Sequence, residues 1–305
     1  MKSGRMERNF EVVVDMDDSL NYEVRHPILE VLRIPLITLL NQLPPRAAKA
    51  VFTAFDSKGG NTRKVQRYAT TFKALEIMYT FKERERRGET NISERFWQNF
   101  LNNGISLRNR LKLTVREVTK AVKEVAKEKK EVHLLSLGSG SSRAIIETLA
   151  QLNGQIPIKA KLIDRSRGSI CFSQKLASNH GVAINMKWHR DHVENLDRYC
   201  GEDFCPEVVE MVGLLDYYPR EASIDLVNRI YKALPTGGYL ITCNVIPNHE
   251  QPFITKGVGW PMIYKTPEEL KEIMVNAGFS GKNVGLIFEP LRVHCMSICQ
   301  KSLGA

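Results

Sequence analysis

Two glycines, Gly138 and Gly140, stand one residue apart between an apolar segment at residues 132–137 and a helical pattern. Because glycine lacks a Cβ atom, the chain can turn tightly there and a ligand can approach the backbone. The free N–H groups at the start of the following helix suit a carboxylate or a phosphate. The stretch from Ser136 through Ser139 to Gly140 therefore predicts a ligand cradle at the end of a strand.

Acidic side chains follow the second and third predicted strands. Asp164 ends the second strand, where its carboxylate can accept hydrogen bonds from both hydroxyls of a ribose. Asp164 can alternatively cap the helix that starts near Ser166. Asp191 and His192 end the third strand, and the carboxyl ends of parallel strands meet at one edge of a sheet. We therefore expect these side chains to lie near the glycine pair.

A second polar group follows the fourth predicted strand, which ends at Gly213. Asp216 either acts as a general base or bonds the backbone ahead of the next helix. Tyr217 or Tyr218 can orient a nucleophile or face a cation, and at least one of them is expected to pack under that helix. Asn244, near the end of the fifth strand, is expected to face the same cleft. The candidate catalytic residues are therefore Asp216, Tyr217, Tyr218 and Asn244.

The predicted secondary structure that must position these residues changes near residue 131. Residues 1–130 predict helices, preceded by a polar arm at residues 1–20. From residue 132 onward, strands alternate with helices, which is the pattern of a mostly parallel sheet. We therefore predict a helical cap domain at residues 1–130 and a catalytic domain at residues 131–305.

Several helix boundaries are predicted from local signals. Pro35 should break the helical segment that contains it, and residues 63–86 should form one long helix. Thr114 with Glu117 has capping-box spacing and predicts a helix start. Thr266, followed by a proline and two glutamates, predicts another helix start.

The order of these segments resembles the class I S-adenosylmethionine (SAM)-dependent methyltransferases over residues 132–300. LLSLGSGSS is similar to the first, glycine-containing motif, and KLIDRSRGSICFSQKLA to the second strand with its ribose-binding acid. WHRDHVENL is similar to the third strand with its adenine-side Asp, and ALPTGGYLITCNV to the turn and fifth strand. The resemblance implies an α/β, Rossmann-like, seven-stranded and mostly parallel sheet with an all-helical N-terminal cap. It also implies SAM as cofactor, bound by Ser136, Gly138, Ser139, Gly140, Asp164, Arg165, Ser166, Asp191, His192 and Gly213.

Two positions depart from the pattern of this family. The family usually has Asp or Glu where this chain has Ser136, and a third glycine where it has Ser142. The acidic residue normally helps to hold the amino group of the cofactor. We expect another residue to supply that contact; the alternative is that the aminopropyl arm lies differently.

The loop GLLDYYP lacks the Asn/Asp-Pro-Pro-Tyr/Phe pattern of enzymes that methylate adenine or glutamine amides. It resembles the loops of small-molecule and polyketide-associated methyltransferases, so the leading prediction is methyl transfer to a small molecule enclosed by the cap. One alternative keeps SAM without methyl transfer: aminocarboxypropyl transfer, or closure of SAM to azetidine-2-carboxylate with release of methylthioadenosine. Another alternative is an RNA-binding or RNA-modifying protein that uses a basic cap.

Composition constrains these alternatives. The 305-residue chain has a formal net charge of +10, and the whole excess lies within residues 1–130. Its basic clusters alternate with glutamate at helical spacing, which favours solvated helix surfaces over a nucleic-acid face. The six cysteines form no CxxC pair, and the first 25 residues lack an apolar signal core. We expect a cytoplasmic protein that binds a small molecule, without a metal or a membrane partner.

Overall fold

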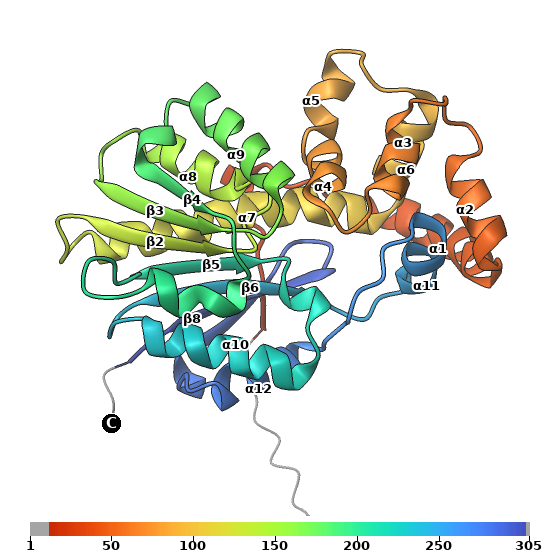
Figure 1. Cartoon of the computed structure of the whole chain (residues 1–305). Coiled ribbons are helices and arrows are strands. Elements are labelled where there is room, and N and C mark those ends of the chain that lie inside the picture. The colour runs from red at the N-terminus through yellow and green to blue at the C-terminus, as the bar shows by residue number, and fades with distance from the viewer. Residues whose placement is uncertain (1–11, 303–305) are drawn as a thin grey trace, which may run out of the picture.

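The structure, a computed structural model, describes residues 12–302. One eight-stranded sheet lies at its centre, in the order β1-β7-β8-β6-β5-β2-β3-β4 (Figure 1). Neighbouring strands are parallel except that β8 runs antiparallel to both β6 and β7. The strands are β1 (Val12–Val14), β2 (Val132–Leu137), β3 (Ile158–Ile163), β4 (Met186–His189), β5 (Val208–Val212), β6 (Tyr239–Val245), β7 (Val284–Phe288) and β8 (His294–Gln300).

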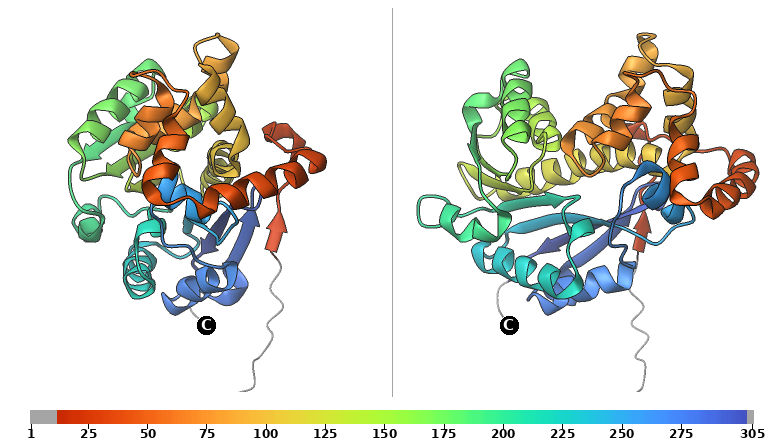
Figure 2. Two further views of the ribbon diagram at one scale, coloured as in Figure 1. Left: turned by 90° about the vertical axis from the view of Figure 1, so that its right-hand side faces the viewer. Right: turned by 45° about the vertical axis from the view of Figure 1, so that its right-hand side comes forward.

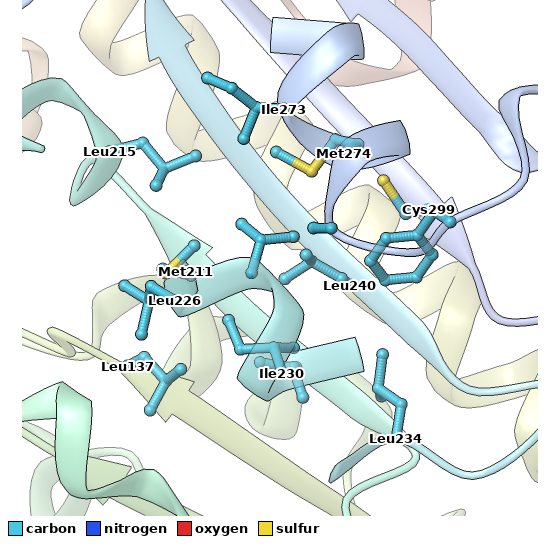
Figure 3. Close-up of a cluster of buried hydrophobic side chains, with 14 of the residues drawn as sticks. Leu137, Met211, Leu215, Leu226, Ile230, Leu234, Leu240, Ile273, Met274 and Cys299 are labelled. Atoms are coloured by element: carbon cyan, nitrogen blue, oxygen red, sulfur yellow. The ribbon is translucent and has the colours of Figure 1, made fainter. Parts of the chain in front are cut away.

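Helices cover both faces of the sheet (Figures 1 and 2). On one face lie α7 (Asn102–Val125), α8 (Arg143–Leu152) and α9 (Arg167–Asn179), and on the other lie α10 (Arg220–Ala233) and α12 (Pro267–Asn276). Figure 3 shows the apolar core under α10 and α12, where Leu226 and Ile230 lie near Met211 of β5. This burial fixes the strands, and with them the edge at which β2, β3, β4 and β5 end.

A group of short helices stands beyond that edge, and we call it the cap. Its members are α1 (Pro27–Gln42), α2 (Pro45–Thr53), α3 (Asn61–Arg67), α4 (Phe72–Tyr79), α5 (Phe81–Arg86) and α6 (Ile92–Phe100). They share an apolar core with the segment that follows β6, namely α11 (Gln251–Phe253) and a π-helical turn (Ile254–Val258). No helix within residues 12–302 combines the length and apolar content needed to cross a membrane.

The sheet contains one strand more than predicted. β1 pairs in parallel with β7 and comes from residues 12–14, inside the polar arm that preceded the predicted helices. Three residues are too short for an alternating pattern to identify a strand, so the edge pairing was missed. Residues 1–11 of that arm lie outside the described part of the chain.

Three helix predictions were wrong for identifiable reasons. Pro35 lies inside the continuous helix α1. Residues 63–86 contain parts of three helices: the chain turns between α3 and α4 at Thr70, which has a positive φ of 65°, and α4 ends at its C-cap, Thr80, before α5 begins. Thr114 lies within α7, where its hydroxyl donates a hydrogen bond to the Arg110 carbonyl instead of capping a helix.

Other local signals were confirmed. Thr266 and Glu269 form a reciprocal capping box at the start of α12. β6 lies within ALPTGGYLITCNV, where the resemblance placed the fifth strand, and β7 and β8 form an antiparallel pair. The fold is thus the predicted α/β arrangement. The division at residue 130 stays a prediction, and α7 from that first part packs directly on β5, β6 and β8.

Candidate functional site

The glycine loop follows β2 as predicted. Gly138 and Gly140 have positive φ angles of 64° and 53°, a conformation that strains most side chains. A Cβ atom on Gly138 would also lie 3.1 Å from the Leu214 side chain. The conformation favours glycine at both positions, and the close contact with Leu214 adds to this at Gly138.

Asp164 ties this loop to the end of the neighbouring strand. Its Oδ2 accepts a hydrogen bond from the Gly140 N–H at 2.8 Å, and its Oδ1 accepts one from the Ser166 N–H at 2.7 Å. The side-chain cap of α9 is Ser166, whose hydroxyl accepts from Ser169 N–H at 3.2 Å. Asp164 is therefore held beside the glycine loop, with a carboxylate at the edge where a ribose would lie.

Asp191 lies one strand farther along the same edge. It accepts hydrogen bonds from the Asn195 amide at 2.7 Å, the Tyr199 hydroxyl at 2.8 Å and the His192 N–H at 2.8 Å. These bonds, led by that from Asn195, lower the pKa of Asp191 to about 2. His192 and Arg165 are exposed beside it, so the edge of β4 presents a fixed carboxylate to solvent.

Glu210 is a site residue that the sequence analysis missed. It lies in β5 directly opposite Ser136 of β2, and the Ser136 hydroxyl donates to Glu210 Oε2 at 2.6 Å. The Val212 N–H donates to the other carboxylate oxygen at 2.9 Å. Burial raises the pKa of Glu210. The carboxylate that is absent at position 136 is thus present on the adjacent strand. Glu210 is the one acidic residue in the otherwise apolar sequence VVEMV, and this was the feature of the sequence that could have identified it.

A cavity lies beside the glycine loop and Glu210, and we call it the loop cavity. Asp164 and Asp191 are not part of its wall. It encloses about 500 Å³, part of it open to solvent. Its walls include Gly138 to Ser142, Glu210, Tyr79, Thr114, Arg110 and Leu75. Carboxylate, guanidinium and free backbone groups therefore surround one space.

Arg110 stands in the middle of α7 and is 3% exposed. Its Nη2 donates to the Tyr79 hydroxyl at 3.1 Å, while its buried Nε has no hydrogen-bond partner among residues 12–302. Burial acts to lower the pKa of Arg110, but Tyr79, Cys243 and Asp216 hold it above its ordinary value. A buried, charged guanidinium with an unused donor is suited to bind an anion.

A second, largely apolar cavity lies between the cap and the sheet edge, and we call it the cap cavity. It encloses about 670 Å³, part of it open to solvent. The cap side contributes Phe52, Val65, Leu75, Met78, Trp97, Leu101 and Leu107, and the sheet side contributes Arg110, Gly213, Asp216, Tyr217 and His294. Leu75 and Arg110 line both cavities, so the two cavities are neighbours that share these residues in their walls.

Two titratable side chains on the sheet side are buried. Asp216 is 3% exposed, accepts a hydrogen bond from Val245 N–H at 2.8 Å, and has its pKa raised by burial. His294, at the start of β8, is also 3% exposed, and its Nδ1 has no partner in the described chain. Burial, with the nearby Arg110 cation, lowers the pKa of His294 well below its ordinary value. A neutral imidazole with a free nitrogen can accept a proton from a ligand.

The predicted catalytic residues separate into two groups. Asp216 and Tyr217 line the cap cavity, and the Tyr217 hydroxyl accepts a hydrogen bond from Trp260 Nε1 at 2.8 Å. Tyr218 and Asn244 are not part of either cavity wall. The Tyr218 hydroxyl donates to Glu194 at 2.6 Å. The Asn244 amide bonds to the carbonyls of residues 245 and 263, which gives it a role in holding the loop.

Comparisons with known proteins bear on this site. The model of a family described as "Putative methyltransferase" (Methyltransf_20) matches residues 52–300. A search of curated proteins found no match. Among solved structures, a possible exported protein from Bordetella parapertussis is similar with a TM-score of 0.68 and 15% identity, over 92% of this chain and all of that one.

Two methyltransferase structures are similar at a lower level. The SAM-dependent methyltransferase SibL in its apo form has a TM-score of 0.50 and 14% identity, over 75% of this chain and 71% of that one. Magnesium protoporphyrin IX methyltransferase from Synechocystis PCC 6803 with bound S-adenosylhomocysteine has a TM-score of 0.50 and 15% identity, over 74% and 96%. At these identities the similarity concerns the fold.

Proposed function

Because the chain belongs to this methyltransferase family and is thus a SAM-dependent transferase, we propose that it methylates a small, mainly apolar molecule held in the cap cavity. The observation that carries the proposal is that two neighbouring cavities share Arg110 and Leu75 in their walls. One space is polar and next to the glycine loop, and the other is apolar and enclosed by the cap. Such a pair suits a charged cofactor next to an apolar acceptor.

The residues of the loop cavity fit SAM, which when bound supplies a methyl group on a positively charged sulfur. In the proposed complex, Glu210 accepts hydrogen bonds from the ammonium group of the methionine part. The Nε of Arg110, which has no partner within residues 12–302, donates to the carboxylate of that part. Asp164, at the next strand end, accepts hydrogen bonds from the two ribose hydroxyls. This arrangement supports the interpretation that another residue replaces the acid missing at Ser136.

The cap cavity offers a methyl acceptor an apolar wall that excludes water and side chains that can take up a proton. Apolar side chains from α2, α3, α4 and α6 exclude water from one side, and Trp260 and Met262 contribute to the wall. On the sheet side, the free Nδ1 of His294 can take the proton that a hydroxyl or amine acceptor loses on methylation. Asp216, with its raised pKa, is the second group on that side able to exchange a proton.

The basic residues of the cap support a small-molecule acceptor over RNA. Several of them are paired with glutamates rather than arranged as a free face: Lys82 with Glu85, Arg84 with Glu94, and Arg87 with Glu83. Such pairs reduce the positive potential that phosphate binding requires.

Mass spectrometry of the products formed from SAM tests the proposal. The purified protein is incubated with SAM alone and with a small-molecule fraction of a cell extract. We expect S-adenosylhomocysteine and a product heavier by one methyl group only when the extract is present. Methylthioadenosine formed from SAM alone, above its rate in buffer, would instead indicate attack on the aminocarboxypropyl carbon and replace methyl transfer.

Replacing Glu210 by glutamine should weaken SAM binding about 10-fold or more, because a hydrogen bond to a charged group contributes about 1.5–3 kcal/mol. Isothermal titration calorimetry measures the dissociation constant. Methylthioadenosine provides the matched control, since it lacks the amino and carboxylate groups and should bind the wild-type protein and Glu210→Gln equally. Equal SAM affinity in both proteins, or an equal loss for methylthioadenosine, contradicts the assigned role of Glu210.

A further inference from the structure

Helix α1 turns its apolar side chains outward. Five of them are between 56% and 69% exposed: Ile28, Leu29, Val31, Leu32 and Leu39. A helix on the surface of a globular protein normally buries such residues and exposes its polar ones. Figure 2 shows α1 at the outer side of the cap, away from the sheet.

The inward side of the same helix carries its charges. Glu30 and Arg33 are the two charged residues of α1, and Arg33 is 5% exposed. The Arg33 guanidinium pairs with Glu30 and with Glu250, which precedes α11. Asn41 donates to the His249 carbonyl at 2.8 Å and accepts from Phe253 N–H at 3.1 Å. The inward side of α1 thus already has its partners. The exposed apolar side chains on its other side are therefore not core residues that point the wrong way.

We propose that this stripe is the contact between two copies of the chain. Ile28, Leu32 and Leu39 follow one another at spacings of four and seven residues, which places them on one side of the helix. The helix is about 24 Å long, so the stripe offers a continuous surface of the kind that marks protein interfaces. Because the stripe carries no charge, two copies related by a twofold axis meet without burying like charges against each other.

The charge pattern favours a second copy over the other occupants. Helices that lie on a lipid surface carry Lys and Arg beside their apolar face, whereas the one arginine of α1 is buried in an ion pair. Residues 1–11, which lie outside the described structure, contain five charged residues among MKSGRMERNFE and offer few apolar side chains to cover the stripe.

Sedimentation equilibrium on the full chain tests this inference without any substrate. We expect twice the monomer mass for the wild-type protein and the monomer mass for the double variant Leu32→Glu, Leu39→Glu. Ile184→Glu is the matched control, because Ile184 is 93% exposed and lies between α9 and β4. It should remain a dimer, and circular dichroism should show the same helical content in all three proteins.

A second variant covers the case in which two glutamates disturb the helix. Leu32→Ala with Leu39→Ala retains helix propensity and should raise the dimer dissociation constant about 10-fold or more, since each loses buried apolar surface. A monomeric wild-type protein, or a double variant that stays dimeric, overturns the inference. A monomeric wild-type protein that floats with phosphatidylglycerol vesicles would assign the stripe to lipid instead.

Discussion

Replacing Asp164 by alanine should raise the dissociation constant of SAM about 100-fold. In the proposed complex, the Asp164 carboxylate accepts hydrogen bonds from both ribose hydroxyls, and each charge-assisted bond contributes about 1.5–3 kcal/mol. It also holds the glycine loop through the Gly140 N–H and the start of α9 through the Ser166 N–H. Its removal therefore affects both the direct contact and the shape of the cradle.

Calorimetric titration with SAM measures the change, and Asp164→Asn separates its two parts. Asparagine retains one oxygen acceptor and the size of the side chain, so this variant should bind SAM with an affinity between those of the wild type and Asp164→Ala. A thermal melt without ligand shows whether the fold is intact. Unchanged affinity in Asp164→Ala would remove SAM from this edge of the sheet.

Replacing His294 by glutamine should lower kcat about 100-fold to 10,000-fold while the dissociation constant of SAM stays unchanged. General-base catalysis contributes a factor of that size. His294 is the proposed base because it lines the cap cavity, its lowered pKa keeps it neutral, and its Nδ1 has no hydrogen-bond partner within residues 12–302. The assay uses the acceptor found by product analysis, under single-turnover conditions. His249→Gln is the control: this histidine bonds to Thr38 of α1 and is outside both cavity walls, so it should retain activity.

The lowered pKa of His294 determines the direction in which kcat and stability change with pH. The imidazole is neutral above that pKa, so kcat should stay constant as the pH drops through the ordinary histidine value of about 6.5 and should fall only at a pH well below it. Stability should fall in the same direction, because the unfolded chain binds a proton that the buried imidazole does not. In His294→Gln the loss of stability below about pH 6.5 should be smaller.

If Asp216→Asn loses activity and His294→Gln does not, Asp216 is the base.

The sequence was informative wherever the signal was local. The positive φ of Gly138, the end of β3 at Asp164 and the capping box at Thr266 each depend on a few neighbouring residues. Those features were predictable because strand ends and helix caps are determined within one or two turns of chain.

The residues that were missed depend on contacts between distant segments. Glu210 lies beside Ser136 only through the register of β2 with β5, across 74 residues of chain. The start of α7 is fixed by Glu250, whose carboxylate accepts the N–H groups of Asn102 and Asn103 at 2.7 and 3.0 Å. A carboxylate from about 150 residues away cannot be found by a search for local caps.

The chain enters and leaves the cap through segments that are both joined to the sheet. At the entry, β1 pairs with β7, and Asp15 forms an ion pair with Arg116 of α7 at 2.7 Å. At the exit, α7 packs on β5, β6 and β8. The cap is therefore held to the sheet at two points of the chain, so separating it from the sheet requires the loss of contacts at the entry and at the exit together.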